Sequence, residues 1–403
     1  MKRREILKTL TMLPLAGAIG NSGSLAQYAH ASTSPKRDLF REFGIRTFIN
    51  ASGYYTSLSG SLMQHDAADA IRETATSFCR LEEVQDKVGE RIAKLLHAES
   101  AMVTAGAFSA LMLGMAGVLS GTDQKKVSQI PRLESSGMKT EVILQKAHND
   151  GYAHALTNCG VKLITVETVE ELEKAISEKT AMMYFINYQS SLGKIQHKQW
   201  LDLARKHHIP TMIDMAADLP PKENLWKFHD MGFDLVCVSG GKFMRGPQST
   251  GILSGKKELI AAARLSAPPR GSNIGRGMKV NKEEIFGLYV ALEHFINSDQ
   301  EKEWKILEDR IAIIAQEAAT VPGVKAELIP LPLINRVPTL NISWDRSKIQ
   351  IDNLAANLRD GYPSIEVMSG AGGSINVTAH MLKNDEVKIV AKRIKQELYK
   401  SMV

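Results

Sequence analysis

Two residues that could do covalent chemistry lie in neighbouring β-α units of this chain, Lys242 and Asp214. Lys242 follows the β-branched run Val236–Val238 in a Ser-Gly-Gly-Lys loop, and a second short apolar run, 250–253, closes that loop. Small residues beside a lysine let a ligand approach the backbone, and such an amine can form a Schiff base. Most lysines are surface charges in a chain with 50 lysines and arginines, so the chemical interpretation of Lys242 depends on Asp214.

Asp214 ends the run 211–213, which is typical of a buried strand and follows an amphipathic segment over 199–208. Ligands in α/β sheets bind at the carboxyl ends of strands. A helical segment, 224–231, and a strand, 233–238, connect Asp214 to Lys242, so we expect both side chains in one crevice. Pyridoxal phosphate (PLP) needs this pair, an amine for its aldehyde and an acid for its ring nitrogen. The ordinary alternative for Asp214 is a helix N-cap.

A third feature could bind the cofactor phosphate. The expected strand Ser100–Thr104 is followed by small residues, including Gly106 and Ala107, that open an apolar helix reaching about residue 119. Backbone N–H groups at a helix start bind anions, helped by the helix dipole, although small residues at such a joint often serve close packing alone. Ser239, three residues before Lys242, offers a hydroxyl group for the same phosphate. Together the three features predict a PLP site of the aspartate aminotransferase-like architecture.

The loop around Lys242 also carries a family resemblance. Its run Ser-Gly-Gly-Lys-x-x-Arg-Gly-Pro-Gln-Ser-Thr-Gly resembles the selenocysteine synthase-like branch of PLP enzymes, which contains L-seryl-tRNA(Sec) selenium transferase and D-glucosaminate-6-phosphate ammonia-lyase. The likeness extends from about Phe43 to the C-terminus. Further matching blocks are Arg46–Met63, Met212–Pro221, Glu223–Trp226 and Gly277–Ile285.

The resemblance implies a fold type I enzyme in which Lys242 forms the Schiff base and Asp214 contacts the pyridine nitrogen. It also places Gly106, Ala107 and Ser239 at the phosphate and His148 against the cofactor ring. A polar loop or helix-capping role is the alternative for His148. Gln145 stands where the branch favours a basic residue. Arg245, Arg270 and Arg276 are candidates for binding an anionic substrate group. We expect at most two of them to do so, because a loop arginine is more often a surface charge. Tyr55 is a further candidate for substrate contact.

The reaction that we expect is α,β-elimination by an ammonia-lyase acting on a small hydroxylated amino acid or amino sugar acid. Lys242, once released from the cofactor, is the expected base for the α-proton. Three alternatives stay open: a tRNA-dependent selenium transferase, an aminotransferase or racemase acting on an exported substrate, and a cofactor-binding protein without turnover. The branch further implies a homo-oligomer with sites at subunit interfaces, where Tyr55 and Arg276 would serve a neighbour.

The first 31 residues predict export. Lys, Arg and Glu residues at positions 2–8 precede an apolar stretch, 9–20, and Ala29-His-Ala31 fits a signal-peptidase site. The pair Arg3-Arg4 makes the signal twin-arginine-like, although Lys2 and Ile6 depart from the usual residues. We therefore expect a periplasmic or otherwise exported protein cleaved after Ala31, with the twin-arginine machinery as a partner and no stable membrane anchor. An ordinary secretory signal or an uncleaved tether is the alternative.

Composition fits this interpretation. The formal net charge is +6 over 403 residues, and the expected signal contributes half of it, too little to predict nucleic-acid binding. The three cysteines have no metal-ligand spacing, and we expect no metal. Alternating strands and helices predict an α/β fold with a mostly parallel sheet. The expected divisions are a signal peptide (1–31), an N-terminal arm (32–63), a large PLP-binding domain (64–290), and an interdomain helix with a small α+β domain (291–403).

Overall fold

The structure is a computed structural model that describes residues 37–331 and 336–403. The expected signal peptide and its cleavage site at Ala31 lie outside these residues and stay predictions. The chain divides into two units between Thr47 and Phe48, and each is described by itself. The described part of the first unit holds one short helix, α1 (Leu39–Glu42), whose N-cap Asp38 accepts a hydrogen bond from the backbone N–H of Arg41 at 3.1 Å.

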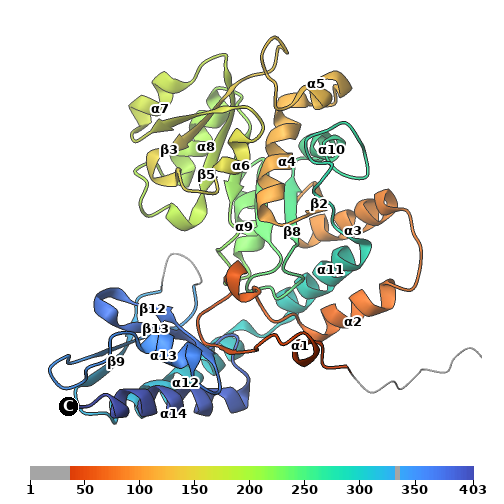
Figure 1. Ribbon diagram of the computed structural model, residues 1–403. Helices are drawn as coiled ribbons and strands as arrows, with labels where there is room; N and C mark the ends of the chain where they lie inside the picture. The colour runs from red at the N-terminus through yellow and green to blue at the C-terminus, as the bar shows by residue number, and fades with distance from the viewer. Residues whose placement is uncertain (1–36, 332–335) are drawn as a thin grey trace, which may run out of the picture. The chain divides into compact units, whose positions relative to one another are not determined.

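The second unit contains a seven-stranded sheet with the order β2-β8-β7-β6-β5-β3-β4 (Figure 1). All of its strands run parallel except β8, which is antiparallel to both neighbours. The expected mostly parallel sheet is therefore confirmed. The strands are β2 (Ser100–Thr104), β3 (Glu141–Gln145), β4 (Lys162–Val166), β5 (Thr180–Ile186), β6 (Thr211–Asp214), β7 (Leu235–Ser239) and β8 (Gly251–Gly255).

Helices cover both faces of this sheet because its strands alternate apolar side chains toward two separate cores. On β5, for example, Met183 and Phe185 belong to one core while Met182 and Tyr184 belong to the other. The first core packs against α3 (Leu81–Leu95), α7 (Val169–Ala175), α8 (His197–Lys206), α9 (Asn224–Met231) and α11 (Lys282–Asn297). The second packs against α4 (Ala107–Ser120), α6 (His154–Thr157) and α10 (Lys257–Leu265). Two further helices are α2 (His65–Thr74), beside α11, and α5 (Gln124–Gln129), beside α4.

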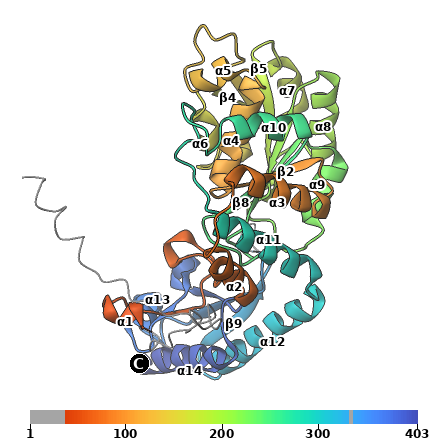
Figure 2. The same cartoon turned by 90° about the vertical axis from the view of Figure 1, so that its right-hand side faces the viewer.

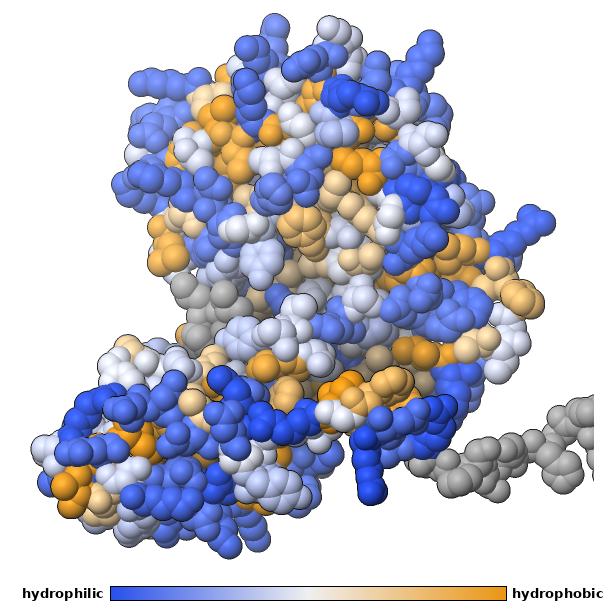
Figure 3. All heavy atoms as spheres, in the orientation of Figure 1, coloured by the Kyte–Doolittle hydropathy of each residue, from blue (hydrophilic) through white to orange (hydrophobic). Residues whose placement is uncertain are grey.

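A smaller four-stranded antiparallel sheet comes next, with the order β12-β13-β10-β9. The long helices α12 (Gln300–Ala319) and α14 (Asn384–Lys400) pack against each other below it, and with α13 (Leu354–Asp360) they enclose a third core (Figure 2). Its strands are β9 (Val324–Ile329), β10 (Thr339–Trp344), β12 (Met368–Ser369) and β13 (Ile375–Thr378). Hydrophilic residues predominate on the part of this region that Figure 3 shows.

Three boundaries differ from the sequence expectation. The sequence pattern predicts a helix over 66–79, but helix α2 ends at Thr74, whose hydroxyl donates a hydrogen bond to the carbonyl of Ala70 at 2.7 Å. Helix α8 begins at His197, two residues early, because Gln196 and Gln199 form a capping box. The sequence pattern also predicts one strand over 364–368, whereas the structure has two strands in two sheets: β11 (Ile365–Glu366) pairs with β1 (Ile49–Asn50), and β12 pairs with β13. The expected domain boundaries stay predictions.

Within the described ranges, no helix combines the length and the apolar character that crossing a membrane requires.

Candidate active site

Several strand ends meet at one edge of the large sheet, and this edge forms the candidate site. The parallel register sets Asp214, at the end of β6, opposite Cys237 of β7. Because β8 runs the other way, its first residue, Gly251, pairs with the last residues of β2 and β7, Thr104 and Ser239. The carboxyl ends of three parallel strands, β2, β6 and β7, and the start of the antiparallel β8 therefore lie together at the edge of the sheet next to the loop that carries Lys242.

Lys242 lies in a loop that its own backbone holds closed. Its carbonyl oxygen accepts hydrogen bonds from the Ser61 hydroxyl at 2.6 Å and from the N–H of Arg245 at 3.0 Å. The side chain is half-buried. Burial lowers the pKa of the Lys242 ammonium group, while the nearby carboxylate of Asp214 acts in the opposite direction. An amine with a lowered pKa is more readily deprotonated and so better able to act as a nucleophile and base.

Asp214 has both carboxylate oxygens engaged. Its Oδ1 accepts a hydrogen bond from the N–H of Ala216 at 2.8 Å, and its Oδ2 accepts one from the hydroxyl of Tyr184 at 3.2 Å. Burial raises the pKa of Asp214, and the hydrogen bond from Ala216 and the charge of Lys242 partly offset that effect. Tyr184 is fully buried on β5. It was not selected from the sequence, although a phenol inside the apolar run 180–186 needs a hydrogen-bond partner.

The start of helix α4 forms the phosphate end of the site. Gly106 is its N-cap with φ of +84°, a conformation that favours glycine, and Gly106 and Ala107 are half-buried. Among the described residues, no oxygen accepts a hydrogen bond from the N–H groups of residues 107–109, which is the usual state of a helix start before a ligand binds. Gly251 packs so closely that a Cβ atom there would lie 2.5 Å from the carbonyl carbon of Gly106.

Ser239 and His148 have different surroundings. Ser239 is half-buried at the end of β7, beside Gly251. His148 is fully buried at the end of a short 3-10 helix, Lys146–His148, with the Phe185 ring edge-on at 4.4 Å. Its Nδ1 accepts a hydrogen bond from the N–H of Ile186 at 3.3 Å, and burial lowers its pKa to about 4, so the imidazole is neutral. Stacking of His148 on a cofactor ring stays a prediction.

Gln145 holds the loop before His148 in place. Its side-chain amide exchanges two hydrogen bonds with the backbone of Ile195, at 2.8 and 2.9 Å. From the far end of the same loop, Asp150 accepts a hydrogen bond from the Tyr188 hydroxyl, and its charge raises the pKa of Asp214. Asp150 and Tyr188 therefore lie near the candidate site, and neither was selected from the sequence.

A second carboxyl group, Asp218, is buried four residues after Asp214. Its Oδ1 accepts a hydrogen bond from Asn187 at 2.8 Å, but its Oδ2 has no partner among the described residues. Burial raises the pKa of Asp218 to about 7, and Lys242 and Asp214 are among the charges that act on it. The sequence contains a signal for Asp218, since Asp214-Met-Ala-Ala-Asp218 repeats the acid within one loop. The sequence alone nevertheless assigns no role to Asp218.

Three aromatic rings from distant segments pack together next to Lys242. They belong to Tyr54, Phe243 and His380, and we call them the aromatic wall. The rings of Tyr54 and His380 meet edge-on at 4.9 Å between centroids, and Phe243 stacks on His380 at 6.1 Å with an interplanar angle of 17°. The Tyr54 hydroxyl and both His380 nitrogens are buried without a hydrogen-bond partner in the described chain. Neither Tyr54 nor His380 was selected from the sequence, because no local pattern links residues 326 positions apart.

The four residues predicted to contact substrate lie in different places. Arg245 is half-buried, donates from Nε to the Leu62 carbonyl at 2.8 Å, and lines a cavity of about 180 Å³ together with Phe243 and His380. Arg270 instead pairs with Glu82 of α3 at 3.1 Å. Arg276 is exposed, and the exposed Tyr55 directs its hydroxyl to the sulfur of Met368 at 3.0 Å. Of the three arginines, the structure brings Arg245 to the aromatic wall, and the substrate roles of all four residues stay predictions.

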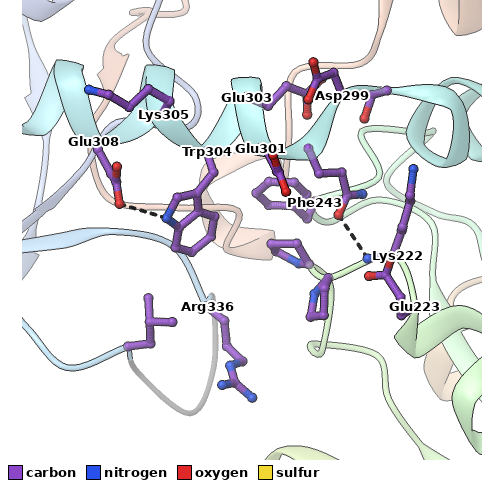
Figure 4. Close-up of a pocket in the computed structure, with 15 residues that line it drawn as sticks. Lys222, Glu223, Phe243, Asp299, Glu301, Glu303, Trp304, Lys305, Glu308 and Arg336 are labelled. Carbon is purple, nitrogen blue, oxygen red and sulfur yellow. Dashed lines mark hydrogen bonds between the residues drawn. The ribbon is translucent and has the colours of Figure 1, made fainter.

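A cavity of about 730 Å³ adjoins this wall (Figure 4). Phe243, next to Lys242, and Pro220, two residues after Asp218, line one side of it, and the N-terminal turns of α12 line the other. Trp304 projects from α12 into this region and donates to Glu308 at 3.1 Å. Five carboxylates and three cationic groups contribute to the lining: Glu223, Asp299, Glu301, Glu303 and Glu308, with Lys222, Lys305 and Arg336.

These groups fit the requirements of PLP. The chain offers a half-buried amine, a carboxylate at the neighbouring strand end, and a helix start that Gly251 packs against without a Cβ atom. Fold and site together define a fold type I PLP enzyme, and a solved neighbour of the same fold carries PLP.

The comparison with known families agrees. The family model described as aminotransferase class-V matches residues 59–281, more than half of the chain. The protein therefore belongs to the class-V aminotransferase family, and PLP is its cofactor.

Three curated relatives show the range of this family. The D-glucosaminate-6-phosphate ammonia lyase of Salmonella typhimurium is 26% identical over 302 residues, which cover 72% of this chain and 78% of that protein. A 5'-C-glycyluridine monooxygenase-decarboxylase of Streptomyces sp is 24% identical over 379 residues, 89% and 92% of the two chains. The L-seryl-tRNA(Sec) selenium transferase of Desulfotalea psychrophila is 25% identical over 286 residues, 64% of this chain and 57% of that one.

A solved structure of D-glucosaminate-6-phosphate ammonia-lyase aligns with 91% of this chain and 99% of its own, with a TM-score of 0.79 and 23% identity. The predicted fold class and the predicted resemblance to the selenocysteine synthase-like branch are both confirmed.

Proposed function

We propose that the protein is a PLP-dependent lyase that releases ammonia from a hydroxylated amino acid by α,β-elimination. The observation that carries this proposal is the placement of Lys242 and Asp214 at neighbouring strand ends, with burial lowering the pKa of the amine and raising that of the acid. Similarity to the Salmonella ammonia lyase favours elimination among the reactions open to such a site.

In this proposal the cofactor supplies an electron sink for the carbanion formed at the substrate α-carbon. Lys242 would hold the cofactor through its aldehyde, and its free amine would take the α-proton of the substrate. Asp214 would hold the pyridine nitrogen in its protonated form, and Tyr184 and the N–H of Ala216 fix the orientation of its carboxylate. The N–H groups at the start of α4 would hold the phosphate.

The charged groups that line the cavity of about 730 Å³ indicate which substrates it would accept. Carboxylates outnumber cationic groups in its lining, five to three, so a phosphate group there would meet net repulsion. Trp304 and Phe243 supply flat apolar surface of the kind that packs on carbon skeletons. We therefore favour an unphosphorylated hydroxyamino acid or amino sugar acid, unlike the phosphorylated compound in the name of the Salmonella relative.

Transamination and racemisation use the same Lys242 and Asp214, and they are the alternatives that share this chemistry. The tRNA-dependent transferase reaction is a further alternative, because L-seryl-tRNA(Sec) selenium transferases are also among the relatives of this chain. A homo-oligomer and export through the twin-arginine machinery complete the proposal. The basis for export is the sequence of the first 31 residues, with its Arg3-Arg4 pair and its apolar stretch.

The test begins with the colour of the protein. Purified wild type should show a near-visible absorption band that borohydride abolishes, and Lys242→Ala should lack it. Lys256→Ala is a matched control, because Lys256 pairs with Asp234 at 2.8 Å and is half exposed. No band in the wild type, even after PLP is added, would refute the cofactor site.

Substrate screening tests the reaction. Release of ammonia and a 2-oxo acid should be followed with D- and L-hydroxyamino acids, and with glucosaminate with and without its 6-phosphate. The proposal expects release from at least one unphosphorylated compound and weaker activity on its phosphorylated partner. Spectral shifts without ammonia release would favour transamination or racemisation.

A further inference from the structure

Asp218 is a buried acid that has no part in the proposed cofactor binding. Two asparagines position it: Asn187 donates to its Oδ1 at 2.8 Å, and Asn224 donates to its backbone carbonyl at 2.8 Å. Asn187 is itself fixed by His197, whose Nε2 lies 2.9 Å from the Asn187 Oδ1. The carboxyl group is therefore held by one oxygen in a defined orientation, while its Oδ2 is buried and has no partner among the described residues.

The groups around Asp218 leave its proton available near neutral pH. Burial raises its pKa to about 7, Asp214 acts in the same direction, and the hydrogen bond from Asn187 and two cationic groups act against it. The charges of Asp214, Arg336 and Lys242 act on the pKa of Asp218. The charge of Asp218 in turn raises the pKa of Tyr54, after the larger effect of burial. A carboxyl group with a pKa near 7 is both protonated and acidic enough to donate at physiological pH.

Tyr54 links Asp218 to further unpartnered polar groups, because burial and then the charge of Asp218 raise the pKa of Tyr54, and the Tyr54 ring meets His380 edge-on. Besides the Asp218 Oδ2, the Tyr54 hydroxyl and both ring nitrogens of His380 are buried without partners in the described chain. Buried polar groups in folded proteins are normally hydrogen-bonded, so these groups are available to a polar group of a ligand. Phe243 connects the cluster to Lys242 in sequence and to His380 by ring stacking.

We propose that Asp218 is the general acid that protonates the departing β-hydroxyl group of the substrate. This inference rests on the proposed elimination reaction. As Lys242 takes the α-proton, the electron pair of the Cα–H bond forms the Cα–Cβ double bond. The Cβ–O bond breaks, its electron pair leaves with the oxygen, and that oxygen takes the proton of Asp218 and departs as water. Hydrolysis of the resulting enamine then consumes one water and yields ammonia and a 2-oxo acid.

The neighbouring groups are less suited to this step. Asp214 has both oxygens occupied by hydrogen bonds. Burial raises the pKa of Tyr54 above that of an ordinary phenol, which makes it a weaker acid. Burial lowers the pKa of His380 to about 3, so its imidazole is neutral and can accept or donate a hydrogen bond to a hydroxyl group. Tyr54 and His380 therefore orient the leaving group, and Asp218 supplies its proton.

The decisive experiment compares two leaving groups. Chloride leaves without a proton, whereas hydroxide needs one, so β-chloroalanine is compared with the hydroxyamino acid of the same configuration that releases ammonia fastest. In the holoenzyme, Asp218→Asn should lower kcat for the hydroxyamino acid by about 100-fold and leave elimination of chloride close to wild type. The alkaline limb of the kcat pH profile should disappear for the hydroxyl substrate. Asp230→Asn, an exposed aspartate on α9, is the matched control.

A second variant keeps the test decisive if Asp218→Asn fails to fold. Asn187→Ala removes the hydrogen bond that lowers the pKa of Asp218, so the alkaline limb should move to higher pH with the hydroxyl substrate. Equal loss with both leaving groups, or no loss with either, would overturn the role of Asp218. If the wild type eliminates chloride but no hydroxyl group, the role of Asp218 is refuted while the protein is still an eliminating lyase. If the wild type eliminates neither group, the proposed function is refuted as well.

Discussion

Two buried aspartates four residues apart, Asp214 and Asp218, differ in how completely their surroundings satisfy them. Asp214 ends a strand, and both of its oxygens accept hydrogen bonds, from Ala216 and Tyr184. Asp218 lies in the loop beyond, where one oxygen is bonded to Asn187 and the other has no partner in the described chain. Burial raises the pKa of both carboxyl groups.

This difference suits the two carboxyl groups to different roles. A carboxylate with both oxygens bonded is held in place, which suits a permanent partner for a cofactor ring. A carboxyl group with a free oxygen and a raised pKa can exchange a proton during each turnover. Substitutions at the two acids test this distinction, and substitutions at the phosphate end of the site and at a surface ion pair show how smaller effects compare with it.

The largest expected effect is on stability and belongs to Asp218. Because its folded-state pKa is about 7 and its ordinary value is 3.8, the folded protein holds this proton more tightly. Its contribution to stability is therefore fully present below pH 4 and is lost as pH rises through 7. At about 1.36 kcal/mol per pKa unit the full loss is roughly 4 kcal/mol, of which roughly 3 kcal/mol falls between pH 5 and 8.

Urea unfolding of wild type and Asp218→Asn at pH 5 and 8 measures this loss. The variant should become more stable relative to wild type as pH rises, while Asp230→Asn should show no such trend. A pH-independent difference between Asp218→Asn and wild type would mean that Asp218 titrates at its ordinary value.

The next effect is on catalysis and belongs to Asp214. Asp214→Asn should keep the coloured cofactor, because Lys242 is intact, but lower kcat/KM by about 10²- to 10³-fold, since it removes a preorganised charge. Tyr184→Phe removes only one hydrogen bond to that carboxylate and should cost about tenfold. Steady-state kinetics with the best substrate measures both. Full activity in Asp214→Asn would refute its role at the ring nitrogen.

A smaller effect is expected at the phosphate end of the site, where close packing rather than charge determines the affinity for PLP. In Gly251→Ala the new Cβ would lie 2.5 Å from the carbonyl carbon of Gly106 and 2.7 Å from the nitrogen of Ala107. Overpacking of this kind costs about 1–3 kcal/mol, so the dissociation constant of PLP should rise roughly tenfold or more. Gly271→Ala is the control, because nothing lies within 4 Å of its added Cβ atom. Unchanged affinity would mean that α4 does not bind the phosphate.

The smallest effect is expected for Arg270→Ala. Its ion pair with Glu82 joins side chains that are 37% and 52% exposed, and such surface pairs contribute less than about 1 kcal/mol. Thermal unfolding should therefore change little, and KM should change less than in Arg245→Ala, whose arginine lies at the aromatic wall. A large rise in KM for Arg270→Ala would show instead that Arg270 reaches an active site in the assembled enzyme.

The cofactor half of this site could be predicted from the sequence because its signals are local. Strands 211–214 and 235–239 are short buried runs, and parallel strands bring the residues at their carboxyl ends to one edge of the sheet. The sequence therefore predicts that Lys242, Asp214 and Gly106 belong to one site. The same logic predicted the mostly parallel sheet, although the split of 364–368 between two sheets depends on pairing with β1 and β13 and has no local signal.

The other half of the site was decided by the tertiary structure. Tyr54 comes from the segment before the large sheet and His380 from the segment after β13, and only the fold of the chain sets them beside Phe243. Asp218 was visible in the sequence as a second acid, but its free oxygen and raised pKa arise from burial and from the position of Asn187. Sequence by itself determined which groups we expect to bind the cofactor, since residue type and strand order bring them to one edge of the sheet. Burial and long-range contact, which exist only in the folded chain, decided which groups are left free for a substrate.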